Sequence, residues 1–217
     1  LYKAVNEYDK ALTYYQTGLE LTKSVRSDKK RAEFLNSIGE VSFRLTNYDQ
    51  ALEFYLKSLK IREEIHDKKG ISDSFNTVGN VYFQLKNYNK ALDYYQQSLK
   101  IRIELKDEIA IAKSYNNIGN MYSILKDYKK SLDYYNDALK LYIEGGEKKL
   151  VSSVHNNIGI IYREKGEHKH ALESFKKSLQ IAKEQDLLYN IANTSNELAR
   201  TYFEVSKYKE AEEHLNT

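Results

Sequence analysis

The sequence predicts an all-α fold built from repeated helical hairpins, and three observations support this. A segment with a central glycine recurs every 40 residues, at Gly39, Gly79, Gly119 and Gly159, with Ala199 in the fifth copy. Such a period indicates stacked units that bury their apolar faces against one another. The 217 residues include no proline, which costs about 3 kcal/mol inside a helix, so long uninterrupted helices are favoured. An apolar content of 41% is enough for a core.

One helix of each predicted hairpin, the B segment, is marked by apolar residues three and four positions apart. In the clearest copy these are Tyr88, Ala91, Leu92, Tyr95 and Leu99, which share one helical face. Further copies start at Tyr8, Tyr48, Tyr128 and His168, and the pattern fades after Tyr208.

The other helix, the A segment, carries the recurring glycine in the order Phe75, Val78, Gly79 and Val81. Turn residues separate the two kinds of segment. They are Asn47, Asn87, Asp127 and Glu167 after A segments, and Asp67-Lys68-Lys69-Gly70, Asp107, Gly145-Gly146 and Asp186 after B segments. We therefore predict one array over 1–217, with full repeats at 32–71, 72–111, 112–151 and 152–191 and partial repeats at 1–31 and 192–217.

The glycine inside each A segment requires an explanation, because glycine in a helix costs about 1 kcal/mol relative to alanine. Ala199 shows that the position requires a small side chain and not a positive φ. A second small residue lies 12 positions later, at Ala51, Ala91, Ser131, Ala171 and Ala211. We expect the two small residues to face each other where the helices of one hairpin touch.

These residues resemble the tetratricopeptide repeat, whose pattern is L-G-x-x-Y followed by A-x-x-x-F. Val78-Gly79-x-x-Tyr82 with Ala91-x-x-x-Tyr95 matches it, as do the copies around Gly119 and Gly159. The period of 40 instead of 34, and the missing proline, resemble a longer-helix subclass found in cell-polarity adaptors, kinesin light chains and bacterial sensor kinases. The resemblance implies a right-handed superhelical solenoid of antiparallel hairpins.

In that family the A helices line a concave groove that binds a peptide. By this resemblance the groove residues are Asn36, Asn76, Asn80, Asn116, Asn120, Asn156, Asn196, Lys113, Arg163, Arg200 and Phe83. Five of the asparagines occupy the same point of every repeat, and an amide suits the alternating donors and acceptors of an extended peptide. The alternative is that each asparagine bonds a neighbouring helix within the stack.

Several other functions are disfavoured. A formal net charge of +3, spread along the chain without a basic block, does not favour nucleic-acid binding. The five histidines are scattered, and the sequence contains no phosphate-binding loop, so we expect no catalytic residues, metal site or cofactor. We also expect no membrane insertion, because no apolar run approaches the roughly 20 residues that span a bilayer.

We therefore predict a non-enzymatic scaffold that binds an extended peptide or a partner helix in the concave groove. One alternative is the sensory or regulatory region of a larger bacterial signalling protein, since the chain begins and ends within repeats and is expected to be a piece. Another is a structural module that self-associates weakly through uncapped ends. The absence of cysteine fits reducing and oxidising compartments equally, and we favour a cytoplasmic location.

Overall fold

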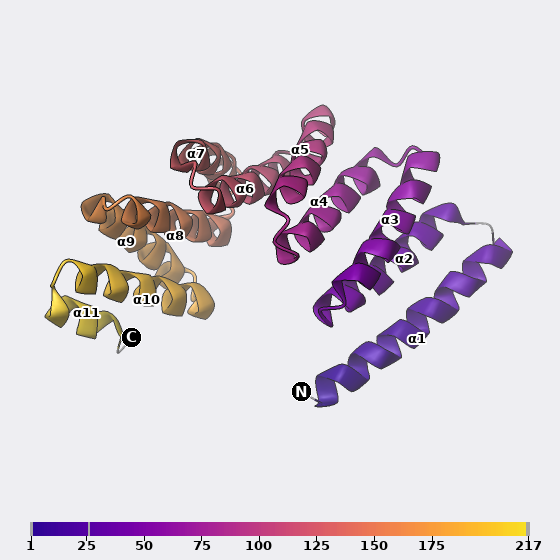
Figure 1. The fold of residues 1–217 in the computed structure, drawn as a ribbon, viewed down its shortest axis with the longest axis horizontal. Coiled ribbons are helices and arrows are strands. Elements are labelled where there is room, and N and C mark those ends of the chain that lie inside the picture. The colour runs from indigo at the N-terminus through magenta and orange to yellow at the C-terminus, as the bar shows by residue number, and fades with distance from the viewer. Residues whose placement is uncertain (1, 26, 216–217) are drawn as a thin grey trace. The chain divides into compact units, whose positions relative to one another are not determined.

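A computed structural model of the protein describes residues 2–25 and 27–215. Every regular element in these residues is an α-helix (Figure 1). The helices are α1 (Tyr2–Val25), α2 (Asp28–Arg44), α3 (Tyr48–Glu64), α4 (Lys68–Gln84), α5 (Tyr88–Leu105), α6 (Glu108–Ile124), α7 (Tyr128–Glu144), α8 (Lys148–Glu164), α9 (His168–Glu184), α10 (Leu188–Glu204) and α11 (Tyr208–Leu215). The predicted all-α class is confirmed.

The helices alternate between the two predicted kinds. The A helices are α2, α4, α6, α8 and α10, which carry the recurring glycine or Ala199, and the B helices are α1, α3, α5, α7, α9 and α11. The predicted repeats begin at the fifth residue of each A helix, about one turn after the helix starts. Counted from the helix ends, the hairpins span 28–64, 68–105, 108–144, 148–184 and 188–215.

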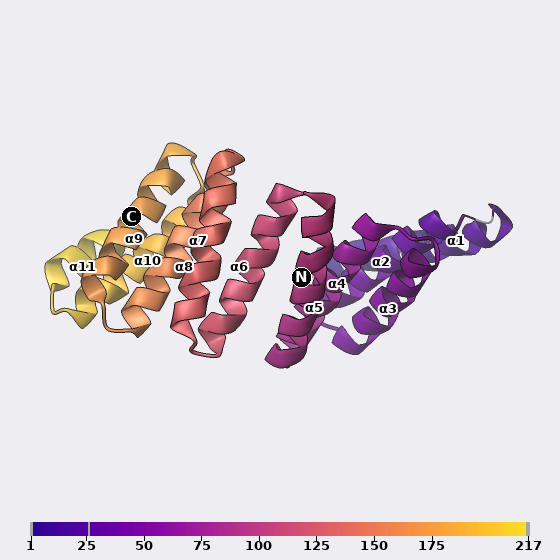
Figure 2. The ribbon, with the colours of Figure 1, turned by 90° about the horizontal axis from the view of Figure 1, so that it is seen from above.

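Contacts between helices divide the chain into two compact units, Leu1–Asp107 and Glu108–Thr217. Within each unit, consecutive helices pack against each other as antiparallel neighbours (Figure 2). In the second unit, α8 also contacts the A helices α6 and α10. That the two units continue each other as one array stays a prediction.

Most turns contain only three residues, which serve as the C-cap of one helix, a left-handed residue and the N-cap of the next helix. After α2, the N–H of Thr46 donates to the carbonyl of Phe43 at 2.9 Å, and the N–H of Asn47 donates to that of Ser42 at 2.9 Å. These two bonds form a Schellman motif, which requires a left-handed residue at its centre. Thr46 has a φ of 61°, and Asn47 is already the N-cap of α3. The other residues with positive φ are His66, Lys86, Lys106, Lys126, Gly146, Gly166, Asp186 and Ser206.

The predicted turn residues mostly cap helices. Asn47, Asn87, Asp127 and Glu167 are all N-caps. The Asp127 side chain, for example, accepts the N–H of Lys130 at 3.3 Å. Gly70 is an exception, because it lies inside the first turn of α4, where its N–H donates to the Asp67 side chain at 3.0 Å.

The recurring glycine of each A helix faces an aromatic ring of the following B helix. A Cβ atom added to Gly39, Gly79 or Gly119 would lie 2.8 Å from the ring of Tyr55, Tyr95 or Tyr135, respectively, and one added to Gly159 would lie 2.5 Å from that of Phe175. These distances are shorter than a carbon–carbon contact allows. The four rings are buried. Glycine therefore lets the ring lie directly on the backbone of the A helix.

The small residue 12 positions after the glycine also lies at this contact, as predicted. The Ser131 hydroxyl donates to the Gly119 carbonyl at 2.9 Å, and Ser131 is completely buried. The closest partner of the glycine, however, is the ring 16 positions later, which the sequence analysis did not identify. The small pair brings the helices together, and the ring then fills the space beside it.

We predict that Gly119→Leu lowers the free energy of unfolding by about 1–3 kcal/mol, because the added side chain must displace the Tyr135 ring. Urea denaturation followed by circular dichroism measures the change. Lys113→Leu, at an exposed position of the same helix, is the control and should leave the midpoint nearly unchanged. Equal midpoints for Gly119→Leu and wild type would show that the contact is not tight.

We also predict that Lys126→Gly and Gly166→Lys change stability in opposite directions. Both residues occupy the left-handed position of a turn from an A helix to a B helix, with φ values of 60° and 76°. A side chain costs roughly 1 kcal/mol in this conformation, and a Cβ at Gly166 would meet no atom within 4 Å. Thermal melts should show a higher midpoint for Lys126→Gly and a lower one for Gly166→Lys. The same sign for both would contradict the strain argument.

Candidate interaction surface of the A helices

In the first three complete hairpins, the residue that follows the recurring glycine accepts a hydrogen bond from the tyrosine ring on the B helix. The Tyr95 hydroxyl donates to Asn80 Oδ1 at 2.8 Å, and the Tyr135 hydroxyl donates to Asn120 Oδ1 at 2.6 Å. In the first complete hairpin, Tyr55 donates in the same way to Glu40 at 3.0 Å. The carbonyl oxygens of Asn80 and Asn120, two predicted groove residues, are therefore used within their own hairpins.

The fourth hairpin changes both members of this pair together. Phe175 replaces the tyrosine and Ile160 replaces the polar residue, so no hydroxyl is left without an acceptor. In the other hairpins burial raises the pKa of Tyr95 and Tyr135, and burial together with the Glu40 charge raises that of Tyr55. The phenols thus remain donors at neutral pH.

The five equivalent asparagines of the A helices differ in exposure. Asn36, Asn76 and Asn116 are half-buried, Asn156 is only 5% exposed, and Asn196 is exposed on the last A helix. Asn156 Oδ1 is buried and accepts no hydrogen bond from the described residues. The predicted ladder thus consists of amides in three different environments.

Three amides lie together between α6 and α8. Asn157 Nδ2 lies 3.5 Å from Asn116 Oδ1 and 3.4 Å from Asn120 Oδ1. Both distances are at the long end for hydrogen bonds, so these bonds are weak. We call Asn116, Asn120 and Asn157 the amide cluster. Asn157 was not predicted, although its position one residue after the repeated asparagine is visible in the sequence.

Arg163, a predicted groove cation, is buried between α8 and α10 and is 6% exposed. Its guanidinium donates to Glu197 of α10 and lies 3.9 Å from Glu204. Arg200 Nε lies 3.4 Å from the same Glu204 carboxylate. Because a buried charge must be paired, Glu197 and Glu204 fix Arg163 in the helix contact.

The remaining predicted groove residues are accessible to different extents. Lys113, Asn196 and Arg200 are exposed. Phe83 is half-buried at the end of α4, with its ring centroid 6.1 Å from that of Tyr88. Among the predicted groove residues of the second unit, the exposed side chains are therefore two cations and an amide, beside the half-buried amide cluster.

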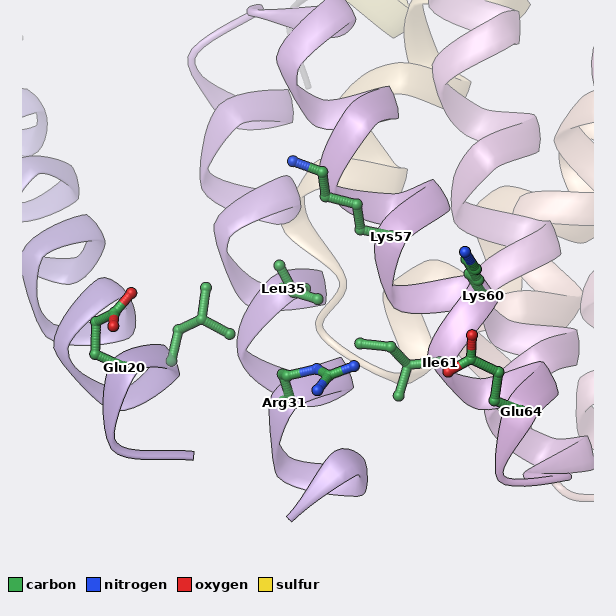
Figure 3. A pocket seen from close by; sticks show the side chains of 8 residues that line it. Glu20, Arg31, Leu35, Lys57, Lys60, Ile61 and Glu64 are labelled. Atoms are coloured by element: carbon green, nitrogen blue, oxygen red, sulfur yellow. The ribbon is translucent and has the colours of Figure 1, made fainter. Parts of the chain in front are cut away.

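A separate hollow lies between α1, α2 and α3 (Figure 3). It has a volume of about 450 Å³. Its lining residues are Leu19, Glu20, Arg31, Leu35, Lys57, Lys60, Ile61 and Glu64. We call it the α1–α3 hollow. The repeat pattern did not predict this hollow, because its lining comes from three helices and the predicted groove residues all lie on the A helices.

No group of three or more histidine, aspartate or glutamate side chains among residues 2–25 and 27–215 is arranged to hold a metal ion. In the same part of the chain, none of the helices combines the length and apolar character needed to span a bilayer.

The model of the tetratricopeptide repeat family matches the sequence in five overlapping segments. These are residues 1–64, 30–104, 70–144, 110–184 and 150–217, which together cover the chain. No curated protein matches the sequence.

Several solved structures are similar to this one. BtubC from P. vanneervenii has a TM-score of 0.82 at 18% identity, over 96% of this chain and 88% of its own. The Rap conjugation gene regulator of plasmid pLS20, in complex with the Phr* peptide, has a TM-score of 0.72 at 18% identity, over 86% and 52%. A Signal Transduction ATPase with Numerous Domains from Pyrococcus horikoshii, with a tetratricopeptide repeat sensor, has a TM-score of 0.81 at 21% identity, over 99% and 33%. At these identities the likeness concerns the fold.

We predict that the pair of Tyr95 and Asn80 contributes to stability only when both members are present. Tyr95→Phe should cost about 0.5–1.5 kcal/mol, and Asn80→Ile should cost more because it leaves a buried hydroxyl without an acceptor. The double variant reproduces the pair of the fourth hairpin and should recover part of the loss. A double-mutant cycle from urea denaturation measures this coupling. Strictly additive losses would show that the bond does not couple the two residues.

Proposed function

Because this chain belongs to the tetratricopeptide repeat family, we propose that it is a protein-interaction module whose A helices bind an extended peptide or a partner helix. The observation that carries this proposal is the amide cluster of Asn116, Asn120 and Asn157. Its long internal bonds are weak, so a peptide can replace them at low cost.

The chemistry of the amide cluster suits the backbone of a peptide. Each amide carries a carbonyl acceptor and two N–H donors, whereas an extended peptide presents alternating N–H and C=O groups. The Tyr135 hydroxyl fixes the Asn120 carbonyl at 2.6 Å, so this side chain is held in one orientation before a ligand arrives. An oriented side chain loses less entropy on binding.

Charged side chains next to the amides supply selectivity. Lys113 and Arg200 are exposed on α6 and α10, and they favour a ligand with carboxylates. Both Arg200 and the buried Arg163 lie near the Glu204 carboxylate. A carboxylate of the ligand would therefore compete with Glu204 for the exposed Arg200. In the first unit, Asn36, Asn76 and Asn80 with the half-buried Phe83 offer a similar set of amides beside an aromatic ring.

A regulatory role within a larger protein is the second candidate. Structures of similar fold include a gene regulator in complex with a peptide and an ATPase with a tetratricopeptide repeat sensor. The chain corresponds to 52% of the first and 33% of the second. In such a protein, peptide binding to the A helices would control the activity of a linked domain.

We predict that peptides selected from a display library by the wild-type chain lose affinity for the Lys113→Ala, Asn116→Ala variant by about tenfold, the effect of losing one or two hydrogen bonds. The matched control is Asn136→Ala, Lys140→Ala, which removes the same two side-chain types from exposed positions of the B helix α7. Fluorescence anisotropy of the labelled peptides measures both affinities.

Equal affinities for wild type and the A-helix variant, or a loss only in the α7 control, would overturn the proposed surface. Light scattering over a range of protein concentrations tests the alternative of self-association. If no peptide is selected and the particle mass rises with concentration, the chain is a self-associating module instead.

A further inference from the structure

The α1–α3 hollow has an apolar floor and a charged rim. Leu19, Leu35 and Ile61 contribute the floor, one residue from each helix. In Figure 3, the Arg31 side chain extends across the hollow toward Ile61, while Glu20 stands on the opposite wall. The hollow lies beside α2, between α1 and α3 of the first unit, whereas the amide cluster belongs to the second unit, so a ligand here would be separate from one on the amide cluster.

The first complete hairpin lacks an aromatic ring that the three following hairpins carry at one of the positions lining the hollow. The position of Leu35 is occupied by Phe75, Tyr115 and His155 in the three following hairpins. The rings of Phe75 and Tyr115 pack within their own hairpins, with centroids 6.0 Å from Tyr94 and 5.8 Å from Tyr134. A leucine at this position leaves the volume of a ring partly empty.

In the first complete hairpin, the aromatic residue stands one position earlier in the sequence than in the three following hairpins. Phe34 precedes Leu35, whereas the later hairpins have Ser74, Ser114 and Val154 there. Gly18 of α1 makes room for it, since a Cβ at Gly18 would lie 2.5 Å from the Phe34 ring. The Phe34 ring therefore occupies the contact between α1 and α2 and cannot fill the space beside Leu35.

A second hollow lies in the other unit, and only part of its lining corresponds to that of the α1–α3 hollow. It lies between α7, α8 and α9 and is lined by Tyr142, Ile143, Gly146, Lys148, Val151, Ile181 and Glu184, of which the last three correspond to Arg31, Ile61 and Glu64. Its volume is about 240 Å³, compared with about 450 Å³ for the α1–α3 hollow. The hairpin with the smaller hollow has a ring, the half-buried His155, at the position of Leu35.

We propose that the α1–α3 hollow binds an aromatic side chain of a partner protein. The apolar floor matches the faces of a ring, and the Arg31 guanidinium complements the negative charge of its π-system. The ion pair of Arg31 Nη1 with Asp28 Oδ1 at 3.1 Å holds the guanidinium at the edge of the hollow. The rim carries two lysines, Lys57 and Lys60, and two glutamates, Glu20 and Glu64, so these four charges offset one another. The hollow therefore recognises the aromatic ring of the partner and not its net charge.

Indole is a suitable probe because it is the largest aromatic side-chain group without a backbone. Methyl-labelled wild-type protein is titrated with indole and followed by NMR, and we expect half-saturation on the order of 1 mM, as for a small fragment. Shifts should be confined to the methyl groups of Leu19, Leu35 and Ile61. Leu35→Phe, which restores the ring of the other hairpins, should abolish these shifts while the protein stays folded.

Two further variants separate ring binding from a general apolar contact. Ile103→Phe places a ring at an exposed position of α5 and should leave indole binding unchanged. Arg31→Gln should weaken indole severalfold but not cyclohexanol, which has no π-system. The proposal is overturned if indole causes no confined shifts, if Leu35→Phe binds it as well as wild type, or if Arg31→Gln weakens both probes equally.

Discussion

Each complete hairpin depends on the contact between the bare backbone at a glycine and an aromatic ring 16 residues later. Burying a ring removes about 150–250 Å² from water, which corresponds to roughly 4–6 kcal/mol as an upper estimate. The hydrogen bond of the phenol adds about 0.5–1.5 kcal/mol. Ring packing therefore supplies most of the stability. The hydrogen bond instead determines which residue follows the glycine. A tyrosine is paired with a polar residue there, and Phe175, which has no hydroxyl, is paired with Ile160.

Contacts between hairpins rely on polar side chains to a larger extent. Arg62 of α3 donates to the Gly70 carbonyl of α4 at 2.7 Å and to Ser74 at 2.9 Å. In the second unit, Asn190 of α10 donates to Ser152 at 3.2 Å, and Arg163 pairs with Glu197. These side chains stabilise the stack and are no longer free to contact a ligand. The interaction surface that we propose consists of predicted groove residues that the stacking leaves accessible, chiefly Lys113 and Arg200, together with the half-buried amide cluster.

Departures from the repeat pattern create local features that the regular hairpins lack. The Phe34 ring lies on Gly18. In the three hairpins that follow, the position of Phe34 holds a serine or valine, and the position of Gly18 holds a serine or alanine. This one-residue displacement keeps the contact between α1 and α2 apolar but leaves a hollow beside Leu35. A change at one or two positions can thus alter the packing of a single hairpin in an array of similar units, because each hairpin packs mainly on its neighbours.

The sequence by itself determined the helices, their alternation and the tight contact at each glycine. These features depend on spacings within one hairpin, such as the 12 residues from Gly119 to Ser131, and a regular period displays them directly. Only the tertiary structure decided the environment of each repeated asparagine. Asn116, Asn156 and Asn196 occupy the same position of the repeat, yet one joins a cluster, one is buried and one is exposed. Their environments depend on partners such as Asn157, 41 residues from Asn116, and the repeat pattern does not specify which of these contacts form.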